Sequence, residues 1–338
     1  MGKYRRHFTV VAVLVVLGTV FMDWLLRTVL YLPPEASTQA RIVDGLLRIH
    51  IALIAFFFSL IVVFVAYSVI VFRARPGEEG DGDFIHGHTT LEIVWTAVPL
   101  VIVIVLGLIG ARTLNEMTAP QPNEMVIQVV GRQWSWTFTY PDTGITSSEM
   151  VVPVDQPILL KMESPDVIHS FYVAEFRIKQ DLVPGRVTEV RFTPTQTGVF
   201  LVRCAELCGT AHADMRAPVR VVTQEEYQAW VQEQSAQPAD DPVALGQKVA
   251  ETQGCLACHS IDGTRLVGPT WQGLFGKEEA LEDGRTVTVD EAYLYRAIVD
   301  PDAEIVAGFP PGVMPQNYGE VLSEEEIQAL IEYIKSLQ

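Results

Sequence analysis

The chain has 338 residues, 49% of them hydrophobic, and it carries a formal net charge of −17. Lys and Arg total 24 against 41 acidic residues, which excludes a basic nucleic-acid-binding surface. Its length allows two or three domains, and such an acidic chain with so much apolar sequence predicts membrane segments and acidic soluble domains in separate places. The four cysteines form two close pairs at 204/208 and 255/258, too few and too clustered for a disulfide-stapled secreted domain.

The first 112 residues predict three transmembrane helices. Residues 51–72 contain no charged residue and are long enough to cross the hydrocarbon core of a bilayer, and residues 93–111 form a second such segment. Residues 8–32 form a third, in which Asp23 and Arg27 lie four positions apart and can pair on one face of a helix. A cleavable signal peptide is the alternative for this first segment, but no convincing small-residue cleavage site follows it.

Basic residues predict the orientation of these helices. Lys3, Arg5 and Arg6 precede the first segment, and Arg73 and Arg75 follow the second. Basic loops remain in the cytoplasm. Three spans then place the N-terminus inside and everything after residue 112 outside.

The remaining sequence predicts two soluble domains. Short β-type runs broken by Pro, Gly and Asp are typical of a β-sandwich or barrel. Helical patterns return near the C-terminus, where Ser323 and Glu326 form a capping box before an amphipathic helix. We therefore expect a multidomain membrane protein with an extra N-terminal helix and loop (1–47), a transmembrane helical hairpin (48–115), an all-β domain (123–222), a linker (223–241) and an all-α domain (242–338).

The stretch CAELCGTAHADM predicts a copper site. It combines Cys204, Cys208, His212 and Met215, and thiolate with thioether sulfur favours copper. His169 offers a second imidazole one strand earlier. A disulfide remains an alternative, as do a zinc site, which more often shows Cys-x2-Cys and no methionine, and a mononuclear blue-copper site, which needs only one cysteine. Two thiolates, two imidazoles and a thioether fit two coppers that share bridging sulfurs.

The stretch CLACH predicts covalent attachment of a c-type haem. Cys255 and Cys258 would form the thioether bonds, and His259 would ligate the iron. A thioredoxin-like pair is the alternative, but it would not need the histidine. Met314 is the candidate second axial ligand by elimination, because no histidine and no other methionine follows His259. A five-coordinate haem would leave Met314 an ordinary loop residue, whereas a His/Met pair would raise the haem potential and suit an electron carrier.

At these motifs the chain resembles subunit II of the cytochrome c oxidases, with a fused cytochrome c domain at 242–338. DVIHSF, VPGR and CAELCGTAHADM are similar to that family's dinuclear copper (CuA) domain. The resemblance implies a cupredoxin barrel. It also implies a set of copper ligands: bridging Cys204 and Cys208, terminal His169 and His212, weakly bound Met215 and the backbone carbonyl of Glu206.

The resemblance implies three further roles. The carboxylate of Glu206 would face a magnesium ion at the interface with subunit I. GRQWSWTFTY is similar to an aromatic stretch in which Trp134 lies over the copper site on the electron-entry route, although an ordinary core tryptophan is the alternative. LEIVWTAVP resembles the start of the family's second hairpin helix, where Glu92 would lie at the cytoplasmic mouth of a proton pathway. The alternative for Glu92 is an interfacial glutamate that the helix dipole favours.

Together these features predict the electron-entry subunit of a cytochrome c oxidase in a bacterial plasma membrane. Electrons would pass from a donor cytochrome or upstream respiratory complex through the haem and the copper pair to haem a in subunit I. Dioxygen reduction and proton pumping would occur there, at the haem–copper centre, and subunit III would be a further partner. No residue of this chain would be catalytic in that step, because its three predicted membrane segments contain no histidine that could ligate further haems. The alternatives are a free-standing membrane-tethered electron carrier and, less well matched, the copper domain of a nitrous oxide or nitric oxide reductase.

Overall fold

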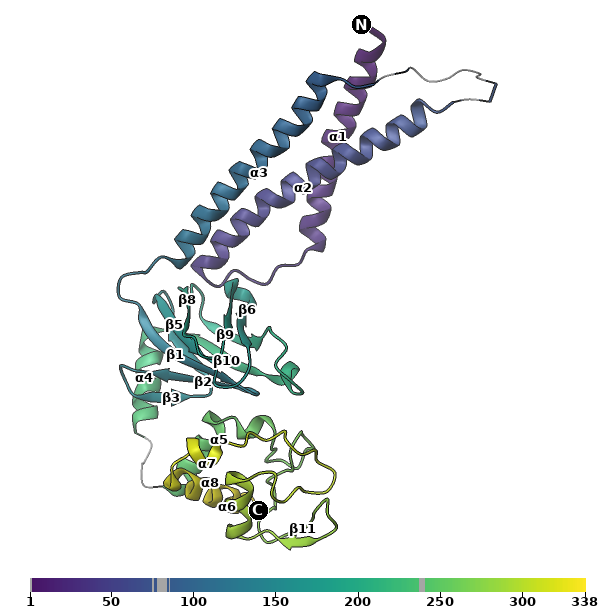
Figure 1. The fold of residues 1–338 in the computed structure, drawn as a ribbon. Helices are drawn as coiled ribbons and strands as arrows, with labels where there is room; N and C mark the ends of the chain where they lie inside the picture. Colours follow the sequence, from purple (N-terminus) through teal and green to yellow (C-terminus); the bar gives the residue numbers. More distant parts are fainter. Residues whose placement is uncertain (1, 75, 78–83, 85, 237–240) are drawn as a thin grey trace. The chain divides into compact units, whose positions relative to one another are not determined.

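The computed structural model describes residues 2–74, 76, 77, 84, 86–236 and 241–338 (Figure 1). These residues divide into two compact units. The first comprises Met1–Glu35 and Gln39–Ala119, and the second comprises Ala36–Thr38 and Pro120–Gln338. The second unit holds both of the predicted metal-binding motifs.

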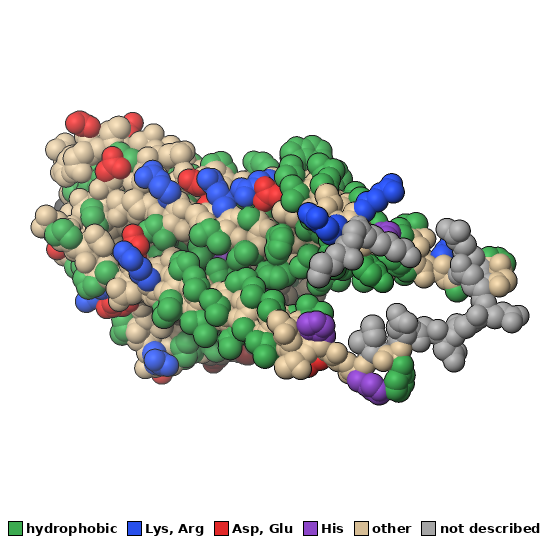
Figure 2. All heavy atoms as spheres, turned by 90° about the horizontal axis from the view of Figure 1, so that it is seen from above, with side chains coloured by type: hydrophobic (Ala, Val, Ile, Leu, Met, Phe, Trp, Pro, Cys, Tyr) green, Lys and Arg blue, Asp and Glu red, His purple; other side chains and the backbone are tan. Residues whose placement is uncertain are grey.

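Three long helices make up the first unit and confirm the predicted transmembrane segments. They are α1 (Gly2–Val29), α2 (Thr38–Val71) and α3 (Thr89–Thr118), each long and apolar enough to cross a membrane. Hydrophobic side chains cover much of the surface of this unit seen in Figure 2. The predicted pair within α1 forms, with Arg27 Nε 2.7 Å from Asp23 Oδ2. Arg75, one of the residues used to predict orientation, lies outside the described residues.

The extra helix α1 packs along α2. A Cβ built on Gly18 would lie 3.2 Å from Cβ of Ser59, so the glycine lets the two backbones approach closely. Nearer the N-terminus, His7 Nδ1 lies 2.7 Å from the hydroxyl of Tyr67. The two helices therefore meet at two separate levels.

The second unit begins with a β-sandwich of two five-stranded sheets, as expected for a cupredoxin. One sheet has the order β3-β2-β1-β5-β8 and the other β4-β10-β9-β6-β7. The first contains β1 (Met125–Arg132), β2 (Ser135–Tyr140), β3 (Ile145–Ser147), β5 (Ile158–Glu163) and β8 (Thr188–Phe192). The second contains β4 (Met150–Pro153), β6 (His169–Val173), β7 (Ile178–Leu182), β9 (Gly198–Cys204) and β10 (Arg216–Val222).

Large aromatic side chains fill the space between the two sheets. Trp136, Phe138 and Phe171 are almost completely buried there, as β-forming residues on inward-facing strand positions should be. The hydroxyl of Tyr140 joins the sheets, because it donates to the carbonyl of Val151 at 2.9 Å and accepts from its N–H at 2.7 Å. This core fixes the strands that carry the copper-site residues.

The polar segment after the sandwich forms helix α4 (Gln224–Ser235). Thr223 and Glu226 close a capping box at its start. Two buried aromatic residues of the helix, Tyr227 and Trp230, pack on Tyr140. The first part of the predicted linker is therefore a helix attached to the β-sandwich, and residues 237–240 lie outside the described part of the chain.

The C-terminal domain is helical, as predicted. It contains α5 (Pro242–Thr252), the 3-10 turn η3 (Cys255–Ala257), α6 (Glu291–Val299), α7 (Tyr318–Val321) and α8 (Glu324–Ser336). The predicted capping box of Ser323 and Glu326 starts α8. Helices α5 and α8 cross at Gly246, where a Cβ would lie 2.0 Å from the carbonyl oxygen of Ala329. The sequence reading missed a small hairpin of β11 (Glu278–Ala280) and β12 (Thr286–Thr288), whose strands have only three residues each.

Candidate copper and haem sites

Two strands and the loop after them bring the predicted copper ligands together. His169 is the first residue of β6 and Cys204 the last residue of β9, and these strands are antiparallel neighbours. The loop between β9 and β10 supplies Cys208, His212 and Met215. The register of the sheet therefore places the more distant histidine beside a ligand-rich loop.

The distances within this cluster match a shared metal site. Cys204 Sγ lies 3.7 Å from Cys208 Sγ and 3.8 Å from His169 Nδ1. Cys208 Sγ lies 3.4 Å from His212 Nδ1 and 3.8 Å from Met215 Sδ. The two sulfurs are too far apart for a disulfide, whose bond is about 2.05 Å long. Two adjacent thiolates flanked by two imidazoles and a thioether fit a pair of soft metal ions.

A second layer of contacts orients His169. The ring is fully buried, and its Nε2 donates to Asp166 Oδ1 at 2.8 Å, which turns Nδ1 toward the cysteines. Such a carboxylate–histidine pair is typical of metal sites. Burial opposes protonation of His169, but the hydrogen bonds to Asp166 and Cys204 outweigh it and raise the pKa to about 8.

The two thiols titrate as a coupled pair. Burial opposes ionisation of Cys204, yet the hydrogen bond with His169 and the backbone contacts outweigh it and lower the pKa to about 6. Burial and the neighbouring Cys204 thiolate raise the pKa of Cys208 to about 12. A cation between the sulfurs would offset the repulsion between the two thiolates, because metal binding displaces the remaining proton.

Trp134 lies directly against the cluster. Its indole Nε1 donates to the carbonyl of Cys208 at 3.2 Å, and the side chain is buried. Gly209 permits this approach, because its φ is +121° and a Cβ there would lie 3.0 Å from the indole ring. The side chain of Glu206 is exposed, while its carbonyl oxygen lies 3.2 Å from Cys204 Sγ.

Glu92 lies in the first turn of α3. Its carboxylate accepts from the N–H of His88 at 3.0 Å, and the His88 ring accepts from the N–H of Leu91. These two bonds close the N-terminus of the helix. The observed contacts of Glu92 are thus those of a helix-capping glutamate.

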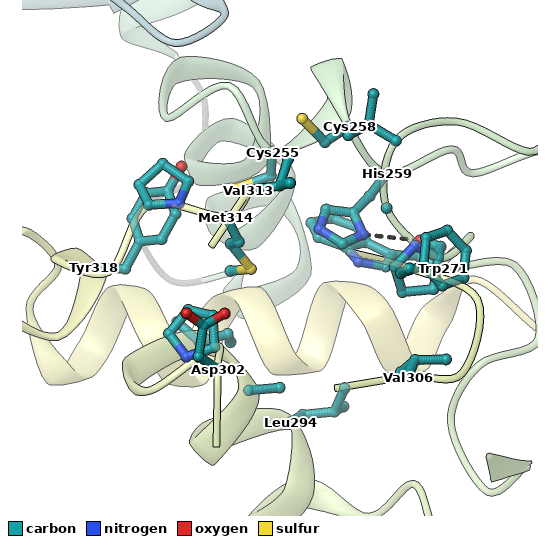
Figure 3. Close-up of a pocket in the computed structure, with 18 of the residues that line it drawn as sticks. Cys255, Cys258, His259, Trp271, Leu294, Asp302, Val306, Val313, Met314 and Tyr318 are labelled. Carbon is teal, nitrogen blue, oxygen red and sulfur yellow. Dashed lines mark hydrogen bonds between the residues drawn. The ribbon is translucent and has the colours of Figure 1, made fainter. Parts of the chain in front are cut away.

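The haem motif borders a large hollow in the C-terminal domain. The hollow has a volume of about 1250 Å³, including solvent at its mouth, and Cys255, Cys258, His259 and Met314 all line it (Figure 3). Figure 3 shows Met314 and His259 on facing sides of the space. Its lining is mainly apolar, so the space and the donor set both fit a covalently held haem.

His259 is fixed in the orientation that a haem ligand needs. Its Nδ1 donates to the carbonyl of Pro269 at 2.8 Å, so Nε2 keeps a free lone pair. The ring stacks on Trp271 at 5.1 Å, and a Cβ on Gly268 would lie 2.7 Å from it. Burial lowers the pKa of His259, which keeps the imidazole neutral.

A proline-rich loop presents Met314. Asp302 Oδ1 accepts from the N–H of Gly312 at 2.9 Å, and Gln316 Nε2 donates to the carbonyl of Met314. The sequence reading did not select Asp302, Trp271 or Asp166. Asp166 is the first residue of the DVIHSF stretch, and its position three residues before His169 is the sequence feature that could have identified it.

Three family models match this chain. The transmembrane domain of cytochrome c oxidase subunit II matches residues 25–112, its periplasmic domain matches residues 145–222, and the cytochrome c family matches residues 243–338. Most of α1 precedes the first match.

Curated relatives extend the match over most of the chain. Cytochrome c oxidase subunit 2 of Alkalihalophilus pseudofirmus is 34% identical over 82% of this chain and 82% of that protein. The subunit 2 of Thermostichus vulcanus is 35% identical over 61% of this chain and 79% of that protein. A solved periplasmic domain of subunit II from Bradyrhizobium japonicum is 36% identical, with 34% of this chain and 96% of that chain covered and a TM-score of 0.33.

These matches agree with the residues at both sites. A subunit 2 periplasmic domain implies a CuA centre, and a cytochrome c domain implies a haem c. The helices and the periplasmic domain together fit a membrane protein with its β-domain outside. The chain therefore belongs to the cytochrome c oxidase subunit 2 family, whose members partner with subunit I in an oxidoreductase complex, and it carries a C-terminal cytochrome c domain.

Proposed function

We propose that this chain is the electron-entry subunit of its oxidase. Electrons from a donor reach the cytochrome c domain, pass to the copper domain and leave for haem a in subunit I. Dioxygen is reduced to water there, coupled to proton pumping, so no residue of this chain takes part in breaking the O–O bond. The observation that carries the proposal is that both ligand sets lie within one compact unit.

The copper domain would hold the two coppers with the clustered side chains. Cys204 and Cys208 would be the shared thiolate ligands, His169 and His212 the imidazole ligands, and Met215 a weak thioether ligand. Glu206 contributes its backbone carbonyl, consistent with the orientation of that oxygen toward Cys204 Sγ. Shared thiolates spread a single added charge over both ions, which suits one-electron transfer.

The cytochrome c domain would hold one haem. Cys255 and Cys258 would form the thioether bonds, while His259 and Met314 would ligate the iron. The haem supplies one-electron redox chemistry, and the His/Met ligand pair raises its potential. The apolar lining of the hollow would exclude water from the iron and favour its reduced, less charged oxidation state.

Other assignments concern the neighbours of this chain. The exposed carboxylate of Glu206 is proposed to face a magnesium ion shared with subunit I, and subunit III is a further partner. Trp134 is proposed to couple the copper pair to its donor, and Glu92 to stand at the cytoplasmic entrance of the proton pathway. The N-terminus lies in the cytoplasm, in agreement with the basic residues at the start of α1 and after α2.

The cytochrome c domain is the proposed docking site for a basic donor. Residues 241–338 include 17 acidic residues and 6 basic residues. A surface of this sign attracts a basic soluble cytochrome and raises its association rate. Oxidation of such a donor should slow as ionic strength rises, and a rate that does not fall would exclude steering by this charge.

Purification of the membrane complex in mild detergent tests the proposed function. We expect a haem-a-containing partner to accompany the chain, with two coppers and one haem c in the chain itself, measured by optical spectroscopy and metal analysis. Absence of a haem a partner would favour a free membrane-tethered carrier. A single copper would contradict the dinuclear assignment.

A further inference from the structure

The turn between β1 and β2 contains a residue that touches both metal-binding regions. The side-chain Nε2 of Gln133 donates to the carbonyl of Cys208 at 2.7 Å. The same residue lines the hollow in the C-terminal domain, as Cys258 does. Among the described residues that line this hollow, Gln133 alone belongs to the β-sandwich.

The backbone of Gln133 is fixed to the copper cluster from a second direction. Its N–H donates to Asp166 Oδ2 at 2.7 Å, and Asp166 also holds His169. Gly209 leaves room for the side chain, because a Cβ there would lie 2.9 Å from Gln133 Nε2. Both ends of the residue are therefore bound to groups that contact copper ligands.

Residues on either side of Gln133 fasten the C-terminal domain to this turn. Arg132 Nη1 donates to Gln253 Oε1 at 2.6 Å, and Thr137 Oγ1 donates to the carbonyl of Thr252 at 2.6 Å. Both acceptors lie at the end of α5, just before the haem motif. The two bonds form a seam that holds the start of the motif against the β-sandwich.

The two motif cysteines divide between the two domains at this seam. Cys255 is buried in the core of the C-terminal domain, whereas Cys258 packs against the core of the β-sandwich together with Val267 and Val313. The cysteine edge of the hollow thus faces the copper domain. Gln133 is the residue of the β-sandwich that lines this hollow among the described residues.

We propose that Gln133 is a positioning residue for electron transfer between the two sites of this chain, an inference that rests on the function proposed above. The rate of electron tunnelling falls less steeply with distance through bonds than through empty space. One hydrogen bond joins the Gln133 side chain, at the wall of the hollow, to the backbone of Cys208. The step moves a single electron: the haem is oxidised, the copper pair is reduced, and no covalent bond forms or breaks. The bonds from Arg132 and Thr137 to the end of α5 hold the haem motif next to the turn that contains Gln133.

The test compares Gln133→Leu with Gln253→Leu in the purified oxidase. Both variants lose a glutamine side chain at the seam, but only the first loses a bond to a copper ligand. After rapid photoreduction of the haem, we expect electron transfer to copper to slow about tenfold in Q133L, the lower end of the range for loss of a second-layer contact. The Q253L rate should fall much less than the Q133L rate, because the bond from Thr137 to the carbonyl of Thr252 still holds the seam.

Two further measurements distinguish a loss of positioning from a damaged copper site. The copper absorption bands and the rate of copper reduction by a small diffusible reductant should be unchanged in Q133L. If Q133L fails to load copper, Gln133→Glu takes its place, because it keeps the length of the side chain and removes the donor. A wild-type rate in the loaded variant, or an equal loss in Q253L, would overturn the inference, whereas absence of copper or haem from the wild-type chain would overturn the proposed function.

Discussion

The copper cluster and the haem hollow are built in opposite ways. The sulfur and nitrogen atoms of the copper-site side chains already lie 3.4–3.8 Å from their neighbours in the cluster, in positions fixed by β6, β9 and the loop after β9. The haem-site residues His259 and Met314 stand on facing sides of a space of about 1250 Å³. A β-ladder can preform a compact site, whereas the helical domain leaves the centre of its own core for the cofactor to fill.

The lining of the hollow shows what this difference means for stability. Leu294, Ile298 and Leu330 line the space and also belong to the core of the domain. Apolar side chains in contact with water forfeit the main favourable contribution to folding. We therefore expect the C-terminal domain to depend on its haem and the β-sandwich to survive loss of copper.

Removing the haem attachment should have the largest effect. In a Cys255→Ala/Cys258→Ala chain we expect α5 and α8 to lose protection in hydrogen exchange followed by mass spectrometry, while the strands of the β-sandwich keep theirs. The matched Cys204→Ser/Cys208→Ser chain should lose its copper absorption and retain protection in both domains. Full protection of α8 without haem would show that the helices need no cofactor.

Gly246→Ala tests whether helix packing limits the C-terminal domain independently of haem. The new Cβ would meet the backbone of Ala329, which cannot move without separating α5 from α8. We expect a loss of ~1–3 kcal/mol in the free energy of unfolding of this domain, as for other overpacked cores. Its exposed neighbour provides the control, since Gln247→Ala should change stability by less than about 0.5 kcal/mol. Denaturant titration of the two loaded variants measures the difference.

The two methionines should respond unequally to substitution. Met314→Leu removes the proposed sulfur ligand of the iron, so the haem reduction potential should fall. Met215→Leu removes only a weak copper ligand and should shift the potential of its centre less. Spectroelectrochemical titration of each variant gives both values, and an unchanged haem potential in M314L would favour a five-coordinate iron.

Asp166→Asn should produce a smaller change, confined to the copper cluster. The amide keeps the shape of the side chain but weakens its hold on the His169 ring, so we expect copper affinity to fall about tenfold. Asp214→Asn alters an exposed carboxylate within the same loop, which pairs with Arg216, and should leave the affinity unchanged. Competition with a copper chelator distinguishes the two, and equal affinities would mean that packing alone orients the ring.

The sequence was most informative where ligands cluster along the chain. The CAELCGTAHADM and CLACH stretches carried most of the ligand predictions, and the helices and β-domain followed from length and residue pattern. His169 required the family resemblance, because strand pairing brings it to the cluster from 35 positions away. Trp271 and Gln133 could not be found from the sequence, since their positions depend on how separate segments fold against one another.

The division of the two motif cysteines also bears on how the protein is assembled. Cys255 is buried and Cys258 is partly covered by the β-sandwich in the finished unit, so both sulfurs are more accessible before the chain closes. We therefore expect attachment to precede closure of the seam. Biogenesis would then follow a fixed order, in which haem is attached to the open chain and the C-terminal domain packs on the copper domain afterwards. A chain without haem would not complete this packing and would not form an oxidase that is unable to transfer electrons.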